Sequence, residues 1–438
     1  MFGLMAMVDW GWDNARALIG MIVIVAIAWL VSEKRSAFPL KTVIGAIGLQ
    51  FIFALLLFGL PKLFGKSSAF GDSGEPNIVI QLLQDATKAG TSFVYGYLGD
   101  NTSFPVSDTG FVAPIFVFQI LPLLIVVASL SAMLWHWGIL RAITRAFAYV
   151  FAKTMGLGGA TSLAVSANIF MGMTEAPVLV KPYLKGMSRS EIFILMTTGF
   201  ATIAGSVLVI YVSFLEGVIA NPLSQLLTAS FMAAPAAVAI ALVIVPEETS
   251  STDRAHEPDF KYQSTMDAFS RGATDGLSIV MNITTMLIAA LAILHLGNSL
   301  LGLLPIQPNG EALSIQRVLG WVFSPLMWLI GVPWEEAQKS GSLMGIKTVL
   351  TEFIAFANLG ETPDAELSER SRIITAHAIC GFANFGSIGI LIGGLAIVEP
   401  DRRDTFLSLA WKTLLAGTLA TCMSGAVVGF LPEALFVN

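Results

Sequence analysis

The chain has 438 residues, of which 55% are hydrophobic and only 12% are charged. A soluble globular domain carries about 25% charged residues, so this composition excludes an ordinary soluble protein. The formal net charge of −6 excludes a basic surface for nucleic acid as the main feature, and no nucleic-acid partner is expected.

Apolar runs, most of them long enough to cross a hydrocarbon core of about 30 Å, recur along the whole chain. The first run follows an acidic start without a basic region, so we expect it to stay as a membrane helix rather than to be cleaved as a signal peptide. The runs lie near 17–31, 43–60, 111–135, 192–220, 226–246, 277–305, 318–332, 373–398 and 406–431. They predict an all-α polytopic membrane protein.

The polar breaks between the runs predict a topology. Their basic clusters should face the cytoplasm, which places the loop 65–77 outside and the mixed-charge linker 247–271 inside. The acidic stretch 359–370 then lies outside. The basic amphipathic stretch 138–155 suits the inner membrane surface, and the short run 318–332 must lie along the outer one.

Two stretches are too polar and too interrupted to be ordinary spans. Residues 156–188 contain several glycines, Pro177 and Glu175, and residues 333–358 contain five charged residues, among them Glu352. Irregular backbone at membrane depth survives only inside protein or along a water-filled cavity. Both stretches are therefore predicted to be re-entrant hairpins.

The two stretches also resemble each other. Thr174-Glu175 precedes a helix that contains the string GFATIAGS, and Thr351-Glu352 precedes one that contains GFANFGSI. The charge pattern predicts that the first hairpin enters from inside and the second from outside. An inverted repeat of interrupted segments indicates a secondary transporter with a site near the membrane midplane.

Glu175 and Glu352 are the strongest candidate site residues, because a carboxylate at membrane depth costs several kcal/mol without a partner. They could accept hydrogen bonds from ligand hydroxyls or take part in cation coupling. The alternative is a structural ion pair, for instance between Glu352 and Lys347. Asn168, Thr202 and nearby carbonyls could form a Na⁺ site where the helices break.

The residues also resemble the concentrative nucleoside transporter family, in its bacterial branch, over nearly the whole chain. The resemblance rests on SANIFMGMTEAP at 166–177, ATIAG at 201–205, GVPW at 331–334, GIKT at 345–348, and CGFAN at 380–384, in that order. It implies a nucleoside importer of the bacterial plasma membrane, driven by a Na⁺ or H⁺ gradient, that works as a homotrimer with an elevator mechanism. It implies no cofactor beyond the coupling ion.

The same resemblance implies about eight transmembrane helices and two opposed re-entrant hairpins, as an inverted repeat. Residues 1–135 and 221–310 would supply scaffold helices, the latter with the cytoplasmic linker 247–271. Residues 136–220 and 311–400 would each supply an interfacial helix, a hairpin and the following helix of the transport part. Residues 401–438 would form the last membrane helix.

The resemblance also assigns roles to single residues. Substrate-binding positions match Met173, Thr174, Glu175, Val207, Glu352, Phe382, Asn384 and Ser387, with the first three facing the base and Glu352, Asn384 and Ser387 holding the ribose. Sodium positions match Asn168, Met171, Thr202 and Ile203. Two departures matter, because Met173 replaces a common glutamine and Thr202 replaces the serine of sodium-coupled members. Base preference and the coupling ion therefore stay open.

Two other classes of function remain as alternatives. A membrane enzyme could use Glu175 and Glu352 as an acid–base pair, but the sequence shows no third catalytic group. A channel for a small polar solute predicts continuous polar faces on spanning helices instead of two broken hairpins.

Overall fold

The computed structural model describes residues 11–63, 68, 78–99, 116–247, 262–304 and 313–436, and within these ranges the secondary structure is helical apart from an isolated bridge at Ser68. The first half contains α2 (Trp12–Leu30), α3 (Leu40–Ala54), α4 (Leu60–Leu63), α5 (Ile78–Tyr95), α6 (Leu123–His136), α7 (Ile139–Met155), α8 (Gly159–Asn168), α9 (Ala176–Leu179), α10 (Lys181–Leu184), α11 (Arg189–Ala201), α12 (Gly205–Leu215) and α13 (Pro222–Ile244). The second half contains α14 (Thr265–Gly302), α15 (Ile315–Leu329), α16 (Trp334–Val349), α17 (Glu352–Glu361), α18 (Glu369–Ile379), α19 (Phe385–Val398) and α20 (Arg403–Phe430).

The predicted polytopic architecture is confirmed. In the described ranges, 7 helices are long and apolar enough to cross a membrane, and the count reaches 8 if the bent pair α15–α16 is taken as one span. A π-helical turn at Leu55–Gly59 joins α3 to α4, so one span runs from Leu40 to Lys62. α18 and α19 form a further, broken helix whose second half is apolar.

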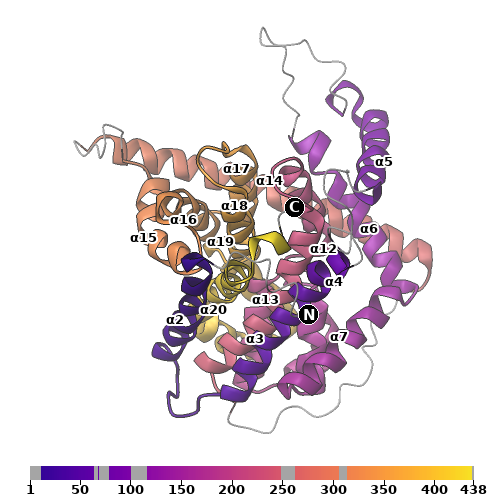
Figure 1. The fold of residues 1–438 in the computed structure, drawn as a ribbon. Coiled ribbons are helices and arrows are strands. Elements are labelled where there is room, and N and C mark those ends of the chain that lie inside the picture. Colours follow the sequence, from indigo (N-terminus) through magenta and orange to yellow (C-terminus); the bar gives the residue numbers. More distant parts are fainter. Residues whose placement is uncertain are drawn as a thin grey trace.

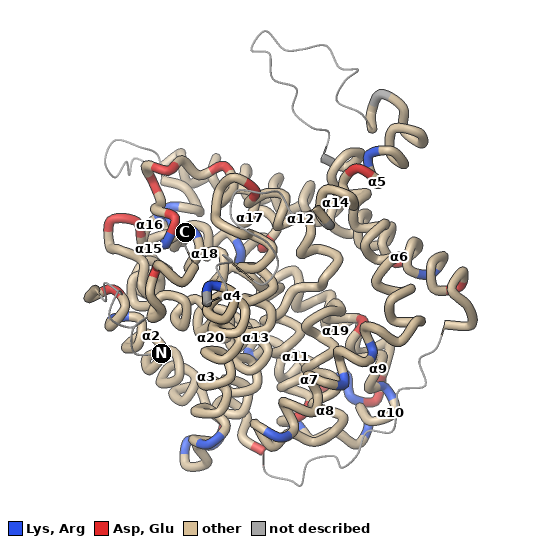
Figure 2. The backbone as a smooth tube through the Cα atoms, turned by 45° about the vertical axis from the view of Figure 1, so that its right-hand side comes forward, with Lys and Arg blue, Asp and Glu red and all other residues tan. Residues whose placement is uncertain are grey.

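The two predicted hairpins are both present as helices joined at a break. Hairpin 1 is α8, the irregular segment 169–175, and the short helices α9 and α10. Hairpin 2 is α16 and α17, which meet at Leu350 and Thr351. Figure 2 shows α8 to α10 at the lower end of the bundle and α16 and α17 at the upper end.

The helices after the hairpins are broken in matching places. The first breaks at residues 202–204, between α11 and α12, and the second at residues 380–384, between α18 and α19. Their packing is reciprocal, because α12 contacts α17 while α19 contacts α9, and α11 contacts α20 while α18 contacts α13. Such an exchange of contacts between the halves is what an internal repeat related by a two-fold axis produces.

Side-chain caps fix where several of these helices begin. Ser188 and Glu191 form a capping box at the start of α11, and the Thr351 hydroxyl accepts from the Ile354 N–H at the start of α17. The Asn384 side chain accepts from the Ser387 N–H at 2.8 Å and so starts α19. The breaks are therefore defined positions in the fold.

The 38-residue helix α14 packs along α6 and crosses behind the bundle in Figure 1. The predicted linker 247–271 ends earlier than expected, because Ser264 caps α14 and the helix begins at Thr265. The rest of that linker at 248–261 and most of the predicted outer loop at 65–77 lie outside the described residues. How the chain divides into fixed and moving parts stays a prediction.

Small residues let helices approach closely around hairpin 2. A Cβ added at Gly341 would lie 2.7 Å from the carbonyl oxygen of Gly320, which brings α16 against α15. A Cβ at Gly429 would meet the carbonyl oxygen of Ile330 at 2.0 Å, so α20 touches the backbone between α15 and α16. Glycine at helix contacts of this kind is typical of membrane proteins.

Candidate functional site

A central cavity of about 180 Å³ lies where the two hairpin breaks meet the two helix breaks. One wall comes from α14, through Ile279, Asn282, Ile283, Met286 and Leu287. The other walls hold all of the predicted substrate-binding residues, which are Met173, Thr174, Glu175, Val207, Glu352, Phe382, Asn384 and Ser387. Residues separated by more than 200 positions in the sequence thus face one space.

Glu352 is held by two side chains from other elements. The Tyr211 hydroxyl of α12 donates to Glu352 Oε1 at 2.9 Å, and the Asn384 amide donates from Nδ2 to Glu352 Oε2 at 3.0 Å. The residue is 6% exposed and occupies the first turn of α17, where the partial positive charge of the helix end favours a carboxylate. Because each oxygen keeps a lone pair, the carboxylate can still accept hydrogen bonds from a ligand.

The structural ion pair between Glu352 and Lys347 is not formed. The Lys347 ammonium is fully buried and donates to Thr421 Oγ1 at 3.2 Å, and no ion pair between the two residues lies within 4.0 Å in the described part of the chain. The positive charge of Lys347 still attracts the Glu352 carboxylate electrostatically, although the two groups are not in contact. The carboxylate is therefore directed to Tyr211, Asn384 and the cavity.

Glu175 has a less constrained position in the break of hairpin 1. Its Oε2 accepts a hydrogen bond from the Gly172 N–H at 3.2 Å, and the side chain is only partly buried. Thr174 beside it packs close to Gly394 of α19, where a Cβ would lie 3.0 Å from Thr174 Cγ2. Met173 is 9% exposed and offers no hydrogen-bond donor to the cavity.

Asn384 has two roles in the cavity wall. Its Oδ1 caps α19 through Ser387 N–H, and its Nδ2 orients Glu352. Ser387 lies 5% exposed on the first turn of α19, and the ring of Phe382 is partly buried in the preceding break. Val207 adds an apolar surface from α12. The cavity thus combines a polar end with apolar walls, which suits a small solute with a planar part.

The predicted sodium residues meet where hairpin 1 touches the break between α11 and α12. The Thr202 hydroxyl lies 2.8 Å from the carbonyl oxygen of Asn168, and the Gly205 N–H donates to the carbonyl of Phe170 at 3.0 Å. This pairing aligns segment 168–171, with Met171, against segment 202–205, with Ile203.

The Asn168 side chain brings an unpartnered amide oxygen to this junction. It is 1% exposed, and its Oδ1 and Nδ2 have no hydrogen-bond partner among the described residues. A buried amide oxygen without a donor is costly unless it meets a ligand. Amide, hydroxyl and carbonyl oxygens are the neutral ligands that broken helices offer to Na⁺.

Tyr211 and the α14 wall are site features that sequence reasoning missed. Tyr211 is fully buried, and its ring stacks on Phe356 at a centroid distance of 4.5 Å. The only signal in the sequence is a hydroxyl within the otherwise apolar string VLVIYV at 207–212 of α12. Asn282 is likewise one of two amides within the long helix α14.

Comparison with known proteins matches three consecutive parts of the chain to family models. Residues 19–98 match the family model for the N-terminus of Na⁺-dependent nucleoside transporters, and residues 225–429 match the model for their C-terminus. Residues 117–217 match a model described as nucleoside recognition.

Several full-length relatives are similar to the chain. The uncharacterized transporter YutK of Bacillus subtilis is 37% identical over 94% of this chain and 98% of its own length. The nucleoside permease NupC of Helicobacter pylori is 34% identical over 94% of this chain and 96% of its own length. The human sodium/nucleoside cotransporter 1 is 34% identical over 96% of this chain and 64% of its own length.

Solved structures of the transporter CNTnw share the fold. Its inward-facing, substrate-bound state superposes with a TM-score of 0.81 at 36% identity, covering 95% of this chain and 98% of that one. An outward-facing state of a CNTnw variant superposes with a TM-score of 0.81 at 34% identity, covering 96% of this chain and 98% of that one.

Proposed function

We propose a function for this chain from one premise: it belongs to the family of Na⁺-dependent nucleoside transporters. It is accordingly a multi-pass protein of the plasma membrane and a transporter rather than an enzyme. We propose that it imports nucleosides by symport with Na⁺. The observation that carries this proposal is the central cavity in which Glu352 is held by Tyr211 and Asn384.

The polar end of the cavity would bind the ribose. Two neighbouring ribose hydroxyls can donate to the remaining lone pairs of Glu352, and charge-assisted hydrogen bonds of this kind are about twice as strong as neutral ones. Ser387 and Asn384 lie on the same side and add neutral partners. Tyr211 and Asn384 fix the carboxylate before the ligand arrives, so little ordering cost remains.

The opposite end would bind the base. Thr174 and Glu175 supply one hydroxyl and one carboxylate, while Phe382 and Val207 supply apolar surface for a planar ring. Met173 offers no donor at a position where an amide would choose between bases. We therefore propose that the site accepts both purine and pyrimidine nucleosides.

The coupling ion would bind at the junction of hairpin 1 and the α11–α12 break. Asn168 and Thr202 would supply side-chain oxygens, and Met171 and Ile203 would supply carbonyl oxygens. The unpartnered buried amide of Asn168 supports this assignment, as does the Na⁺ dependence in the family description. The ion would stiffen the hairpin break that carries Glu175 and so link its binding to that of the nucleoside.

For transport we propose an elevator movement, with α6 and α14 as the fixed wall. These helices pack on each other, whereas α11, α13, α18 and α20 pack together as one bundle behind the hairpins, so this proposal takes α13 out of the scaffold expected for residues 221–310. The inward-facing and outward-facing structures of CNTnw support two such positions for a relative. We also propose a homotrimer, for which apolar side chains exposed on α14, such as Ile288 and Leu291, offer surface.

Uptake by purified protein in liposomes tests this function. Uridine and adenosine uptake is measured with an imposed inward Na⁺ gradient, an inward H⁺ gradient, or neither. We expect both nucleosides to accumulate only with the Na⁺ gradient. In Asn168→Ala, which loses a ligand oxygen, the Na⁺ concentration that gives half-maximal uptake should rise about tenfold. Asn358→Ala, at the end of α17, is the matched control. Uptake that is equal with and without the imposed gradients would contradict symport.

A further inference from the structure

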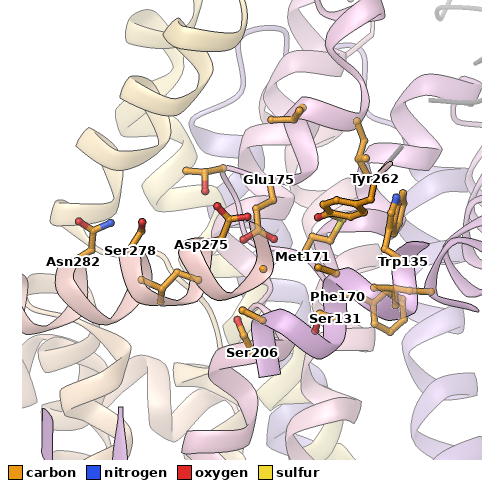
Figure 3. A pocket seen from close by; sticks show the side chains of 18 residues that line it. Ser131, Trp135, Phe170, Met171, Glu175, Ser206, Tyr262, Asp275, Ser278 and Asn282 are labelled. Atoms are coloured by element: carbon orange, nitrogen blue, oxygen red, sulfur yellow. The ribbon is translucent and has the colours of Figure 1, made fainter. Parts of the chain in front are cut away.

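A second and larger cavity, of about 380 Å³, lies between hairpin 1 and the helix pair α6–α14. Its lining includes Ser131 and Trp135 of α6, Ser278 of α14, and Ser206 of α12 (Figure 3). Tyr262, just before the start of α14, also lines it. None of the nucleoside and sodium contacts proposed above requires this second cavity.

The second cavity continues from the central one. Thr174, Glu175, Ile279 and Asn282 line both spaces, so a solute that passes these four residues moves from one cavity to the other. The far end of the second cavity lies at the C-terminal end of α6 and the beginning of α14, next to the linker that the charge pattern places in the cytoplasm. It therefore lies on the path toward the cytoplasm.

The lining repeats the chemistry of the central cavity, because Asp275 adds a second carboxylate beside the shared Glu175. Figure 3 shows the carboxylates of Asp275 and Glu175 next to each other, with the Tyr262 ring beside Glu175. Two adjacent carboxylates can accept from vicinal hydroxyls, and Ser278 and Asn282 lie further along the same face of α14.

Trp135 is an independent observation that points to a ligand at this site. It is 2% exposed, lines the second cavity beside Tyr262, and its indole Nε1–H has no hydrogen-bond acceptor within the described ranges. Buried indole N–H groups usually find a partner. A heteroaromatic base offers both an acceptor for this donor and a flat face for the two rings.

We propose that the second cavity is a resting site for a nucleoside on its way between the central cavity and the cytoplasm. This inference rests on the proposed function. The base contacts Trp135 and Tyr262, and the ribose hydroxyls donate to Asp275 and Glu175. Because Glu175 lines both spaces, it remains in contact with the ligand as Glu352 releases it. Because the Asp275 side chain is exposed, whereas Glu352 is buried, this site should bind the nucleoside more weakly than the central one.

Protection of an introduced cysteine tests the resting site. Ser278→Cys places a thiol in the second cavity, while the native Cys380 and Cys422 are fully buried. The rate of its modification by a water-soluble thiosulfonate is measured in purified protein at increasing uridine, in the parent and in the Glu352→Gln background. Ser270→Cys is the control, exposed on α14 outside the cavity.

We expect uridine to slow modification at least about fivefold in both backgrounds and to leave Ser270→Cys unchanged. Adding Asp275→Asn should raise the half-protecting concentration about tenfold, because a charged acceptor is lost. Phe382→Ala serves as a second way to disable the central site if Glu352→Gln does not accumulate. Protection that disappears with the central site would overturn the proposal, since it would then come from that site or from a conformational change.

Uptake assays on the Ser278→Cys parent separate this outcome from failure of the proposed function. Gradient-driven uridine uptake without protection in the Glu352→Gln background refutes the resting site alone. Absence of both uptake and protection in the parent refutes nucleoside transport, and the resting site with it.

Discussion

At the break of hairpin 2, both carboxylate oxygens of Glu352 accept hydrogen bonds from side chains of other helices, whereas at the break of hairpin 1 Glu175 accepts one from the nearby Gly172 backbone. Glu352 is 6% exposed, and Glu175 is only partly buried and lines two cavities. Both follow a threonine in a repeated pattern.

This difference supports the proposal that the two copies of the motif have separate roles. A carboxylate fixed by Tyr211 and Asn384 presents its lone pairs in a defined geometry, which suits the ribose that all nucleosides share. A carboxylate with one backbone contact can adjust to different bases and can follow a ligand out of the cavity. Each of the following predictions tests that contrast.

Glu352→Gln should have the largest effect. The amide would direct an N–H toward the hydroxyl of Tyr211 or the amide of Asn384, which both act as donors, and it would lose charge-assisted bonds to the ligand. With about 3 kcal/mol lost, uridine uptake should fall about 100-fold, against about tenfold for Glu175→Gln. Initial uptake rates in liposomes measure both, with Glu361→Gln as an exposed control on α17. Equal losses for the two variants would remove the contrast.

Tyr211→Phe should have an intermediate effect. The change removes the hydroxyl that holds Glu352 Oε1 but keeps the ring stacked on Phe356. We expect the KM for uridine to rise roughly tenfold with little loss of stability, because one hydrogen bond to a charged group is lost. Tyr149→Phe, exposed on α7, is the control. An unchanged KM would show that Glu352 does not need this orientation.

Glu33 is a glutamate outside the membrane, and its substitution should have the smallest effect of the series on uridine uptake. Its carboxylate lies 2.9 Å from Arg189 Nη2 and 2.7 Å from Lys412 Nζ. The hydrogen bond from Arg189, helped by Lys412, lowers the pKa of Glu33 below its ordinary value of 4.5. The stabilisation is therefore complete above about pH 4.5 and is lost as the pH falls through the lowered pKa of the folded state.

Because Glu33 is accessible to water, Glu33→Gln should cost less than about 1 kcal/mol of unfolding free energy near pH 7. The difference from the parent should shrink at lower pH, and uridine uptake should change less than twofold, well below the effect at Glu352. Thermal unfolding in detergent at pH 7 and pH 4 measures the first point. A difference that grows toward pH 4 would contradict the assigned sign.

Glu175 and Glu352 could be predicted as site residues because they are charged residues in apolar surroundings. The hairpins could be predicted because glycine, proline and polar residues interrupt the apolar runs. The partners of Glu352 are harder to predict. Tyr211 lies 141 positions away in a helix where an aromatic residue reads as packing. Only the fold shows that its hydroxyl reaches the second hairpin.

Elements without an apolar run were predicted least well. The amphipathic helix α5 (Ile78–Tyr95) was not predicted, because its polar residues lower the hydropathy that identifies spans. The start of α14 was placed inside a polar linker, although the cap at Ser264 and the acidic first turn with Asp267 mark it. The second cavity depends on this start, and the sequence pattern alone did not indicate it.

A comparison of uridine with 2′,3′-dideoxyuridine tests the division of roles most directly. Binding of both ligands is measured by equilibrium titration of the parent, Glu352→Gln and Glu175→Gln. Loss of the two ribose hydroxyls should weaken binding in the parent and in Glu175→Gln by the same factor, and should have little further effect in Glu352→Gln. A penalty that persists in Glu352→Gln, or that disappears in Glu175→Gln, would contradict this division of roles.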